Sequence, residues 1–373
     1  MLKVGIVLMI ARKLRVGFAW IKQSILGLLL NPADVDYFAQ LFHRKFGAFL
    51  YFDVDAAWIE KKSIHHQYFL RRKIVPYDFN PLGKTFEHNN PYGQELGIVI
   101  QGPVKLDENY TERLIDHYLK VFPRAKIILS TWDGQVPIAI ENRTHTDENF
   151  HLVTSKIPQH KGISNINLQI TSSLNGVLRA QDLGCKFVLK TRTDQFIADL
   201  QALNKIHTLY NKYGEGPAGN RILISDRNTF VFRLYGVSDM FMFGRIADLL
   251  KYWNIPHDSR EKFESEIDGS LRAYGKLNVV ESYLSTHYLR TMGHEPQFTL
   301  EDSLKCFRDY FCVINAHEIK LRWDKYTNAN SQWNVSYYPS KFQEMSFLDW
   351  LGLTTSIDDI LAFEEILDRP DDF

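Results

Sequence analysis

The hydrophobic and polar positions between residues 96 and 194 follow two alternating patterns. Continuous apolar runs that stop at turn or polar residues are typical of buried parallel strands, and four such runs occur, at residues 96–102, 125–132, 150–155 and 186–194. Between these runs, apolar residues recur with helical spacing at residues 108–122 and 164–184. Strands that alternate with helices predict an α/β fold, a three-layer α/β/α domain around a mainly parallel sheet.

The regions on either side of this domain have different patterns. Residues 34–75 combine helix-like apolar spacing with clustered bases, and residues 76–94 are rich in Pro, Asn and Gly, which is typical of a linker. We therefore expect a basic, mostly helical N-terminal segment at residues 1–90, one large domain at residues 91–320, and an acidic C-terminal tail with a helix at residues 321–373.

Composition narrows the class of protein. The chain has 373 residues, of which 45% are hydrophobic and 13% aromatic, so it can bury a large core. Lys and Arg (44) balance Asp and Glu (44), which argues against a nucleic-acid partner. The charge is unevenly spread, because residues 1–75 hold twelve basic residues against five acidic ones, and residues 341–373 hold two against nine. The three cysteines show no metal-ligand spacing, which favours reduced thiols in the cytoplasm.

The first thirty residues are mainly apolar and carry five cations and no acid. Their longest charge-free run before Lys22 is the eight residues from Val4 to Ala11, well short of the ~20 that cross a bilayer. A transmembrane helix is therefore not predicted, and the interrupting cations make a signal peptide a weak interpretation. Two interpretations stay open: a peripheral segment on the anionic inner face of the cytoplasmic membrane, or an ordinary helix packed on the core.

The fourth predicted strand ends in an unbroken polar sequence, FVLKTRTDQ at residues 187–195. Because side chains alternate along a strand, one face is expected to receive Lys190, Arg192 and Asp194, and the other Thr191, Thr193 and Gln195. Ligands of parallel α/β sheets gather at the carboxyl ends of the strands. This edge of the sheet is therefore the predicted binding site.

Four segments, taken in their order along the chain, resemble the WavE lipopolysaccharide-synthesis family. They are IVIQGPV (98–104), FPRAKIILSTW (122–132), FVLKTRTDQ (187–195) and SDMFMFG (238–244), and the resemblance extends over roughly residues 96–300. It implies a GT-A-like glycosyltransferase with a nucleotide-sugar donor. The implied acceptor is a saccharide, free or lipid-linked, of the lipopolysaccharide core, the O-antigen or a capsule.

Such a transferase must neutralise the charge that develops on a diphosphate leaving group, and GT-A enzymes commonly use an Asp-x-Asp that binds Mn²⁺ or Mg²⁺. Here Arg192 stands in the place of the first Asp, which leaves Asp194 as the expected metal ligand from this strand. Alternatively, Lys190 and Arg192, with Thr193 beside them, bind the phosphates without a metal. A third possibility is that Arg192 and Asp194 only pair with each other.

A complete Asp-x-Asp does occur, at Asp53 and Asp55. Only 52 residues precede it, and a GT-A fold places its nucleotide-binding strands before this motif. These two residues are therefore the second choice for the donor site.

The remaining donor-binding residues are expected after the first strand and at the start of the long helix. They are Gln101, Gly102, Pro103, Asn165, Asn167 and Gln169. Gly102 would let the backbone approach a base or ribose, and amides at a helix start could face phosphate or ribose. A plain tight turn and a helix cap are the alternative interpretations.

Inverting transfer also requires a base that takes the proton of the acceptor hydroxyl. Glu281, in the first turn of a helix predicted over residues 278–289, ranks ahead of Asp239 for this role. The alternatives are that Glu281 only offsets the helix dipole and that Asp239 binds acceptor hydroxyls or caps a loop.

Two other functions remain open. A sugar nucleotidyltransferase usually needs a glycine-rich, basic loop after the first strand, and residues 101–110 supply one Gly and one Lys. A non-catalytic saccharide-binding or assembly protein would explain why the first Asp of the metal pair is missing.

Overall fold

The computed structural model describes residues 90–261, 270–278, 280–323, 344–361 and 364–368, all within one compact unit. The strands are β1 Leu96–Gln101, β2 Lys126–Trp132, β3 Phe150–Ser155, β4 Phe187–Arg192, β5 Gln195–Ile197, β6 Glu215–Gly216, β7 Gly219–Asn220, β8 Ile222–Ser225, β9 Met242–Arg245, β10 Phe311–Ile314 and β11 Leu321–Trp323. The helices are α5 Tyr110–Val121, α6 Ile138–Thr146, α7 Ile166–Asp182, α8 Ala202–Tyr213, α9 Ile246–Trp253, α10 Leu271–Lys276, α11 Val280–Thr291, α12 Leu300–Tyr310, α13 Phe347–Leu353 and α14 Asp358–Leu361. The basic N-terminal segment predicted at residues 1–90, except its last residue, and the Asp53–Asp55 motif lie outside the described residues.

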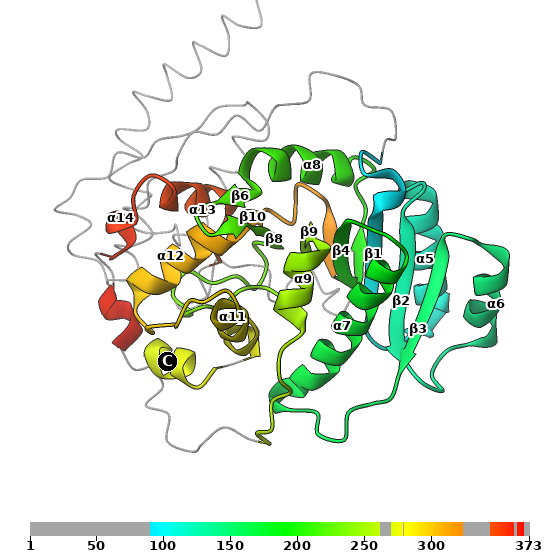
Figure 1. The fold of residues 1–373 in the computed structure, drawn as a ribbon, viewed down its shortest axis with the longest axis horizontal. Helices are drawn as coiled ribbons and strands as arrows, with labels where there is room; N and C mark the ends of the chain where they lie inside the picture. Colours follow the sequence, from blue (N-terminus) through cyan, green and yellow to red (C-terminus); the bar gives the residue numbers. More distant parts are fainter. Residues whose placement is uncertain (1–89, 262–269, 279, 324–343, 362–363, 369–373) are drawn as a thin grey trace, which may run out of the picture. The chain divides into compact units, whose positions relative to one another are not determined.

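Seven strands form the central sheet in the order β10-β8-β9-β4-β1-β2-β3 (Figure 1). β9 runs antiparallel to its neighbours β4 and β8, and the other neighbouring pairs are parallel. Every residue of β1 is buried, as expected for a parallel strand that is covered on both faces. The predicted α/β fold with a mainly parallel sheet is confirmed.

Helices cover both faces of this sheet. On one face α7 packs on β1 and β2, and α9 packs on β4 and β9 (Figure 1). Gly176 makes the close approach of α7 possible, because a Cβ there would lie 2.3 Å from Cγ1 of Val99. On the other face, α5 brings the hydroxyl of Tyr118 against Thr191 and the backbone N–H of Ile197. The sheet is therefore the middle of three layers.

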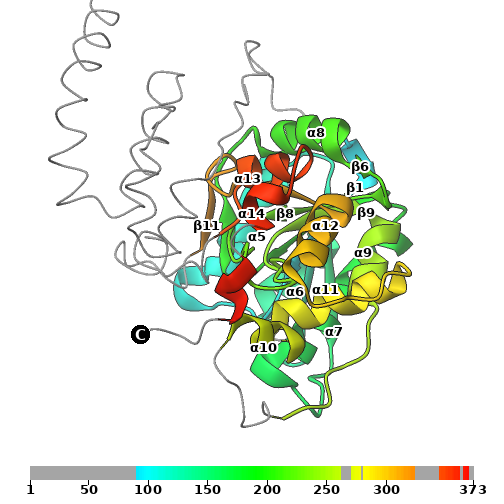
Figure 2. The ribbon, with the colours of Figure 1, turned by 90° about the vertical axis from the view of Figure 1, so that its left-hand side faces the viewer.

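The C-terminal elements close the end of the sheet at β10. Figure 2 looks onto this end and shows α12, α13 and α14 grouped over it. Trp350 of α13 is fully buried, and its indole N–H donates to the backbone carbonyl of Phe307 at 3.1 Å. Further upstream, β11 pairs antiparallel with β5. The described residues after 321 are thus part of the folded domain.

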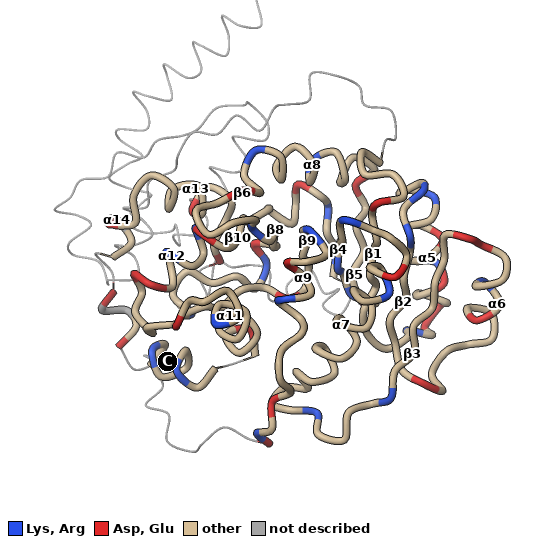
Figure 3. The backbone as a smooth tube through the Cα atoms, viewed as in Figure 1, with Lys and Arg blue, Asp and Glu red and all other residues tan. Residues whose placement is uncertain are grey.

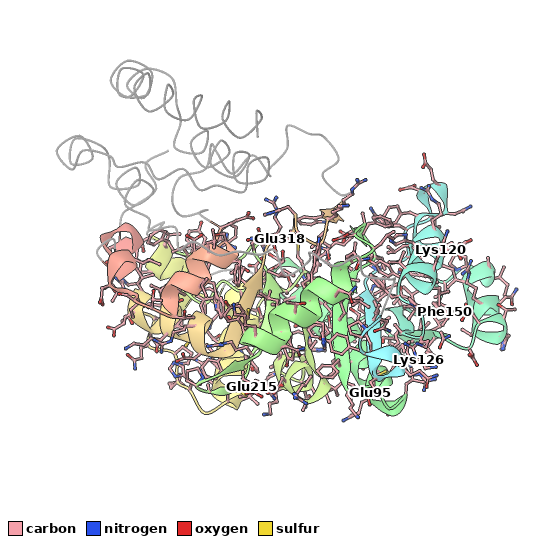
Figure 4. All side chains as sticks on the ribbon, turned by 90° about the horizontal axis from the view of Figure 1, so that it is seen from above. Glu95, Lys120, Lys126, Phe150, Glu215 and Glu318 are labelled. Carbon is pink, nitrogen blue, oxygen red and sulfur yellow. The ribbon has the colours of Figure 1, made fainter. Side chains whose placement is uncertain are left out.

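Figure 4 shows the described side chains from above. The labelled Lys120, in α5, and Glu318, after β10, lie toward one side of this view, and Glu95, before β1, and Glu215, in β6, lie toward the other. Within the described part of the chain, no helix combines the length and the apolar character needed to cross a membrane.

Candidate active site

Lys190 lies in the middle of the fold, with no exposed surface. Its ammonium group donates to the backbone carbonyl of Asp239 and lies 4.8 Å from the centroid of the Trp253 ring. Burial lowers the pKa of Lys190 to about 8, although the nearby carboxylate of Asp239 opposes this shift. One of the three N–H donors of this ammonium is used by the Asp239 carbonyl, so the side chain holds the Asp239 segment.

Arg192 and Asp194 form a two-pronged ion pair at the end of β4. Nε of Arg192 donates to Oδ1 of Asp194 at 2.9 Å, and Nη2 donates to Oδ2 at 3.1 Å. The indole N–H of Trp323 also donates to Oδ2, at 2.9 Å. Burial by itself raises the pKa of Asp194, but the hydrogen bonds and charge of Arg192, together with Trp323 and Lys105, outweigh it and hold the pKa below its usual range. The carboxylate is charged, and both its oxygens accept hydrogen bonds.

Several buried polar atoms have no hydrogen-bond partner among the described residues. They include Oε1 of Gln101, Oε1 of Gln169, Oγ of Ser173 and Oδ2 of Asp239. Buried polar atoms nearly always have a partner in folded proteins, so such atoms indicate a ligand or ordered water.

The register of the sheet places these side chains on the same face. Gln101 pairs with Ser130 of β2, and the hydroxyl of Ser130 donates to the backbone carbonyl of Ser172 in α7. Gln169 lies one helical turn before Ser172, nearer to the carboxyl edge of the sheet. Lys190, whose ammonium binds the Asp239 carbonyl, points to the same face, because it packs against α9.

The turn after β1 requires glycine. Gly102 has a φ of +129°, and a Cβ there would lie 2.7 Å from Oγ1 of Thr193. The backbone N–H of Thr193 donates to the carbonyl of Gln101 at 2.9 Å, which joins the ends of β1 and β4. Pro103, next in the chain, is exposed. Gly102 therefore lets two strand ends meet, and its approach to a base or ribose stays a prediction.

Two asparagines at the start of α7 differ in their surroundings. Asn165 is exposed and has a left-handed φ of +64°. The amide of Asn167 is buried and bonds to both backbone groups of Asp258, at 2.7 and 2.8 Å, and to the carbonyl of His160 at 2.9 Å. Asn167 thus ties two loops together, and donor binding would require these bonds to break.

The two candidate bases lie near one phenol. Burial, then the charges of Asp239 and Glu281, raise the pKa of Tyr252 well above its ordinary value. Glu281 lies in the first turn of α11, as predicted. Its Oε1 accepts from the side-chain amide of Asn228, and its Oε2 faces Nη1 of Arg233 at 3.4 Å. Both oxygens of Glu281 thus have partners, whereas Oδ2 of Asp239 has none among the described residues.

Sequence reasoning did not single out four residues at this edge: Asp226, Asn228, Trp323 and Glu344. Asp226 follows the apolar run of β8 just as Asp194 follows that of β4, so the same signal could have found it. Glu344 and Trp323 lie far away in the sequence and carry no such signal. Figure 3 shows that acidic and basic positions are interspersed around β4, β5, β8 and β9.

Two places in the described part of the chain bring together groups that can bind a divalent cation. Ligand atoms of His294, Asp302 and Cys306 lie within 4.8 Å of one another. Burial raises the pKa of Cys306, which keeps the thiol protonated, and Oδ2 of Asp302 already accepts from Tyr235 and from the backbone of Gln297. These residues fit a structural hydrogen-bond cluster better than a metal site.

At Asp194, a metal would have to share the carboxylate with Arg192, which donates to both oxygens, and with Trp323. The surrounding charges of Arg192, Lys190 and Lys105 favour an anion. The residues present therefore do not fit a divalent cation.

A family model described as WavE lipopolysaccharide synthesis matches residues 96–355, which is more than half of the chain. The chain belongs to the WavE family. The match extends past residue 300, the limit expected from the sequence, and includes β11 and α13. Among curated proteins, none matches the chain.

Solved structures similar to this WavE protein include two transferases. One is a glycosyltransferase involved in the glycosylation of the major capsid of PBCV-1, with 10% identity, a TM-score of 0.26, and coverage of 43% of this chain and 65% of that one. The other is a mannose-1-phosphate geranyltransferase from Thermus thermophilus, with 12% identity, a TM-score of 0.28, and coverage of 54% of this chain and 68% of that one. The chain thus spans slightly less than two thirds of the first structure.

Proposed function

We propose that this WavE protein is a glycosyltransferase that moves a sugar from a nucleotide-activated donor onto a saccharide of bacterial surface polysaccharide. The family membership supports the biological setting. The observation that carries the chemistry is the set of buried atoms on Gln101, Gln169 and Asp239, at the carboxyl edge of the sheet, that have no hydrogen-bond partner among the described residues. Sugars and nucleosides carry the hydroxyl and N–H groups that such atoms bind, and ligands of this fold class bind at this edge.

The diphosphate of the donor is proposed to bind at Arg192 and Lys105, the cations beside Asp194. Guanidinium and ammonium groups form charge-assisted hydrogen bonds with phosphate oxygens, and they stabilise the negative charge of a departing nucleoside diphosphate. Asp194 then orients Arg192, because both of its oxygens accept from that guanidinium. Asp194 as a metal ligand is the alternative, and it requires a rearranged ion pair.

Asp239 is proposed as the general base, ahead of Glu281. In an inverting transfer the acceptor oxygen bonds to the anomeric carbon, the bond from that carbon to the diphosphate oxygen breaks, and the base takes the hydroxyl proton. Oδ2 of Asp239 can accept this proton because it has no other partner among the described residues. The oxygens of Glu281 are held by Asn228 and Arg233, so the structure favours a supporting role for Glu281, the reverse of the order expected from sequence.

Nucleotide binding and turnover test this function in sequence. Purified protein is melted with UDP, GDP, CDP, CMP and dTDP, each with and without Mn²⁺; a ligand at 100 times its Kd should stabilise the fold by ~2.7 kcal/mol. A nucleotide that stabilises equally without Mn²⁺ supports the cationic site, whereas strict dependence on Mn²⁺ supports Asp194 as a ligand. If none of the five stabilises the protein, the donor site is not where we place it.

Turnover then separates the two acids. With the donor so identified, Asp239→Asn should lower turnover by about 10²- to 10⁴-fold and leave nucleotide binding intact. Glu281→Gln should have a smaller effect, and Glu295→Gln, which changes an exposed surface ion pair with Arg290, serves as the control. A crippled Glu281→Gln beside an active Asp239→Asn would exchange the two roles.

A non-catalytic saccharide-binding protein is the second candidate. The observation in its favour is that Asp194 is already fully engaged with Arg192 and Trp323. This candidate predicts that saccharides bind while the protein neither hydrolyses nor transfers from any sugar nucleotide. Release of nucleoside diphosphate by the wild type, absent in Asp239→Asn, would exclude it.

A further inference from the structure

The loop of residues 226–230, which follows β8, lies against Glu344. Oε1 of Glu344 accepts from the backbone N–H of Asn228 at 3.0 Å, and Oε2 accepts from Nη1 of Arg227 at 3.2 Å. The backbone adds two contacts, because Glu344 forms an isolated antiparallel bridge with Phe230 and the N–H of Met345 donates to the carbonyl of Thr229 at 2.7 Å. The side chain of Glu344 is only 13% exposed. A segment remote in sequence thus holds the loop from one side.

The opposite side of the same loop reaches both candidate bases. The side-chain amide of Asn228 donates to Oε1 of Glu281. Oγ1 of Thr229 accepts from the backbone N–H of Ser238 at 3.1 Å, directly before Asp239 in the chain. Asn228 of this loop thus holds the carboxylate of Glu281, and Thr229 holds the backbone next to Asp239.

The conformation of the loop depends on this support. Asn228 has a left-handed φ of +64°, a strained conformation that needs its surroundings to stabilise it. Its backbone N–H bonds to Glu344 while its side chain bonds to Glu281. Without the bond from the Asn228 N–H to Glu344, the backbone turn at Asn228 would no longer be fixed, and its side chain would no longer be directed toward Glu281.

We propose that Glu344 is a positioning residue of the active site, which sets the orientation of Glu281 through Asn228. It touches none of the proposed reacting atoms. This role rests on the proposed transferase function. It adds to the proposed active site a residue that lies 116 positions from Asn228 in the sequence.

A glutamate suits this position because both contacts require acceptors. Each oxygen of Glu344 faces a donor, Asn228 N–H on one side and the Arg227 guanidinium on the other. Glutamine keeps one acceptor and turns a donor NH₂ toward the other N–H group, whereas aspartate keeps two acceptors on a shorter stem. Aspartate should therefore rescue more function than glutamine, although glutamine is closer in size.

The test measures steady-state transfer by the full chain, at a temperature well below the melting point of every variant. Glu344→Gln should lower kcat by about 10- to 100-fold, with the donor KM and the nucleotide-induced thermal shift unchanged. Glu344→Asp should recover part of the loss. Glu301→Gln, in a surface ion pair with Lys305, is the matched control and should behave as the wild type.

Asn228→Ala gives a second variant that does not depend on the folding of the Glu344 variants. It should lower kcat by a similar factor, and the double variant should lose no more than the worse single one, because both changes break one linkage. Wild-type kcat in Glu344→Gln, or losses that multiply in the double variant, would overturn the positioning role while leaving the transferase function standing. A wild type that transfers no sugar from any nucleotide donor would instead overturn the proposed function, and this inference with it.

Discussion

The pH dependence of the unfolding free energy gives a test of the Glu344 environment that requires no substrate. Burial raises the pKa of Glu344 from 4.5 to about 7; the Arg227 charge opposes this shift and the Asp226 carboxyl beside it adds to it. The folded state therefore holds the proton more tightly than the unfolded chain does. The corresponding stability is fully present below pH ~4.5 and is lost as the pH rises through about 7.

The magnitude follows from the size of the shift. Each pKa unit corresponds to about 1.4 kcal/mol, so a rise from 4.5 to about 7 is on the order of 3 kcal/mol of stability lost between pH 4 and pH 8. Asp226, whose pKa burial also raises, titrates together with Glu344 and shares this amount. The side chain in Glu344→Gln carries no charge at any pH. Between pH 5 and pH 8 we expect the free energy of unfolding of this variant to rise by about 1–3 kcal/mol relative to that of the wild type.

Urea unfolding followed by tryptophan fluorescence, at pH 5 and pH 8, measures this difference. Histidines whose pKa values burial lowers, such as His151 and His287, titrate in the same window, but they cancel between wild type and variant. Asp258→Asn is the control. Burial by itself raises the pKa of Asp258, but the hydrogen bonds and charge of Arg260 outweigh burial and lower this pKa. The stability that Asp258 contributes is therefore lost only as the pH falls below the ordinary pKa range of an aspartate. That variant should differ from the wild type equally at both pH values. Parallel curves for Glu344→Gln and wild type would refute the reasoning, since they would mean that the carboxyl of Glu344 is charged and solvated throughout.

Two further substitutions address the strand ends. Gly102→Ala should destabilise the fold by ~1–3 kcal/mol, because φ is +129° and the new Cβ would lie 2.7 Å from Oγ1 of Thr193. Gly134→Ala is the control and should destabilise the fold less, because Gly134 has a φ of +70° but open space around it. Equal shifts of the urea midpoint in the two variants would contradict the steric argument. Lys190→Met keeps most of the buried volume but removes the hydrogen bond to the Asp239 carbonyl, so kcat should fall at least about 10-fold. The melting temperature should change little, because the substitution also removes a buried charge whose desolvation destabilises the fold. An unchanged kcat would show that Asp239 needs no such support.

The sequence by itself determined the elements of the fold. The apolar run at residues 150–155 is β3 without a change of boundary, and the long helix expected over residues 164–184 is α7, Ile166–Asp182. These signals are local, because the alternation of strand side chains and the 3.6-residue helical period follow from backbone geometry alone. The proposed placement of the site at the carboxyl ends of the strands follows from the same pattern, since parallel strands end at one edge of the sheet.

Only the tertiary structure decided which group each polar side chain meets. Lys190 and Arg192 look equivalent in KTRTDQ, yet one donates to a carbonyl 49 residues away in the core and the other pairs with Asp194 at the rim of the site. The sequence ranked Glu281 above Asp239 because its position in a first helical turn is visible in the pattern, but it could not show that Asn228, 53 residues away, already holds that carboxylate. Trp323 lies 129 residues from its partner Asp194 in the sequence, and Glu344 lies 116 residues from its partner Asn228. Periodicity describes neighbours along the chain, whereas the partner of a buried polar group, and with it the group's charge and role, depends on how distant segments pack.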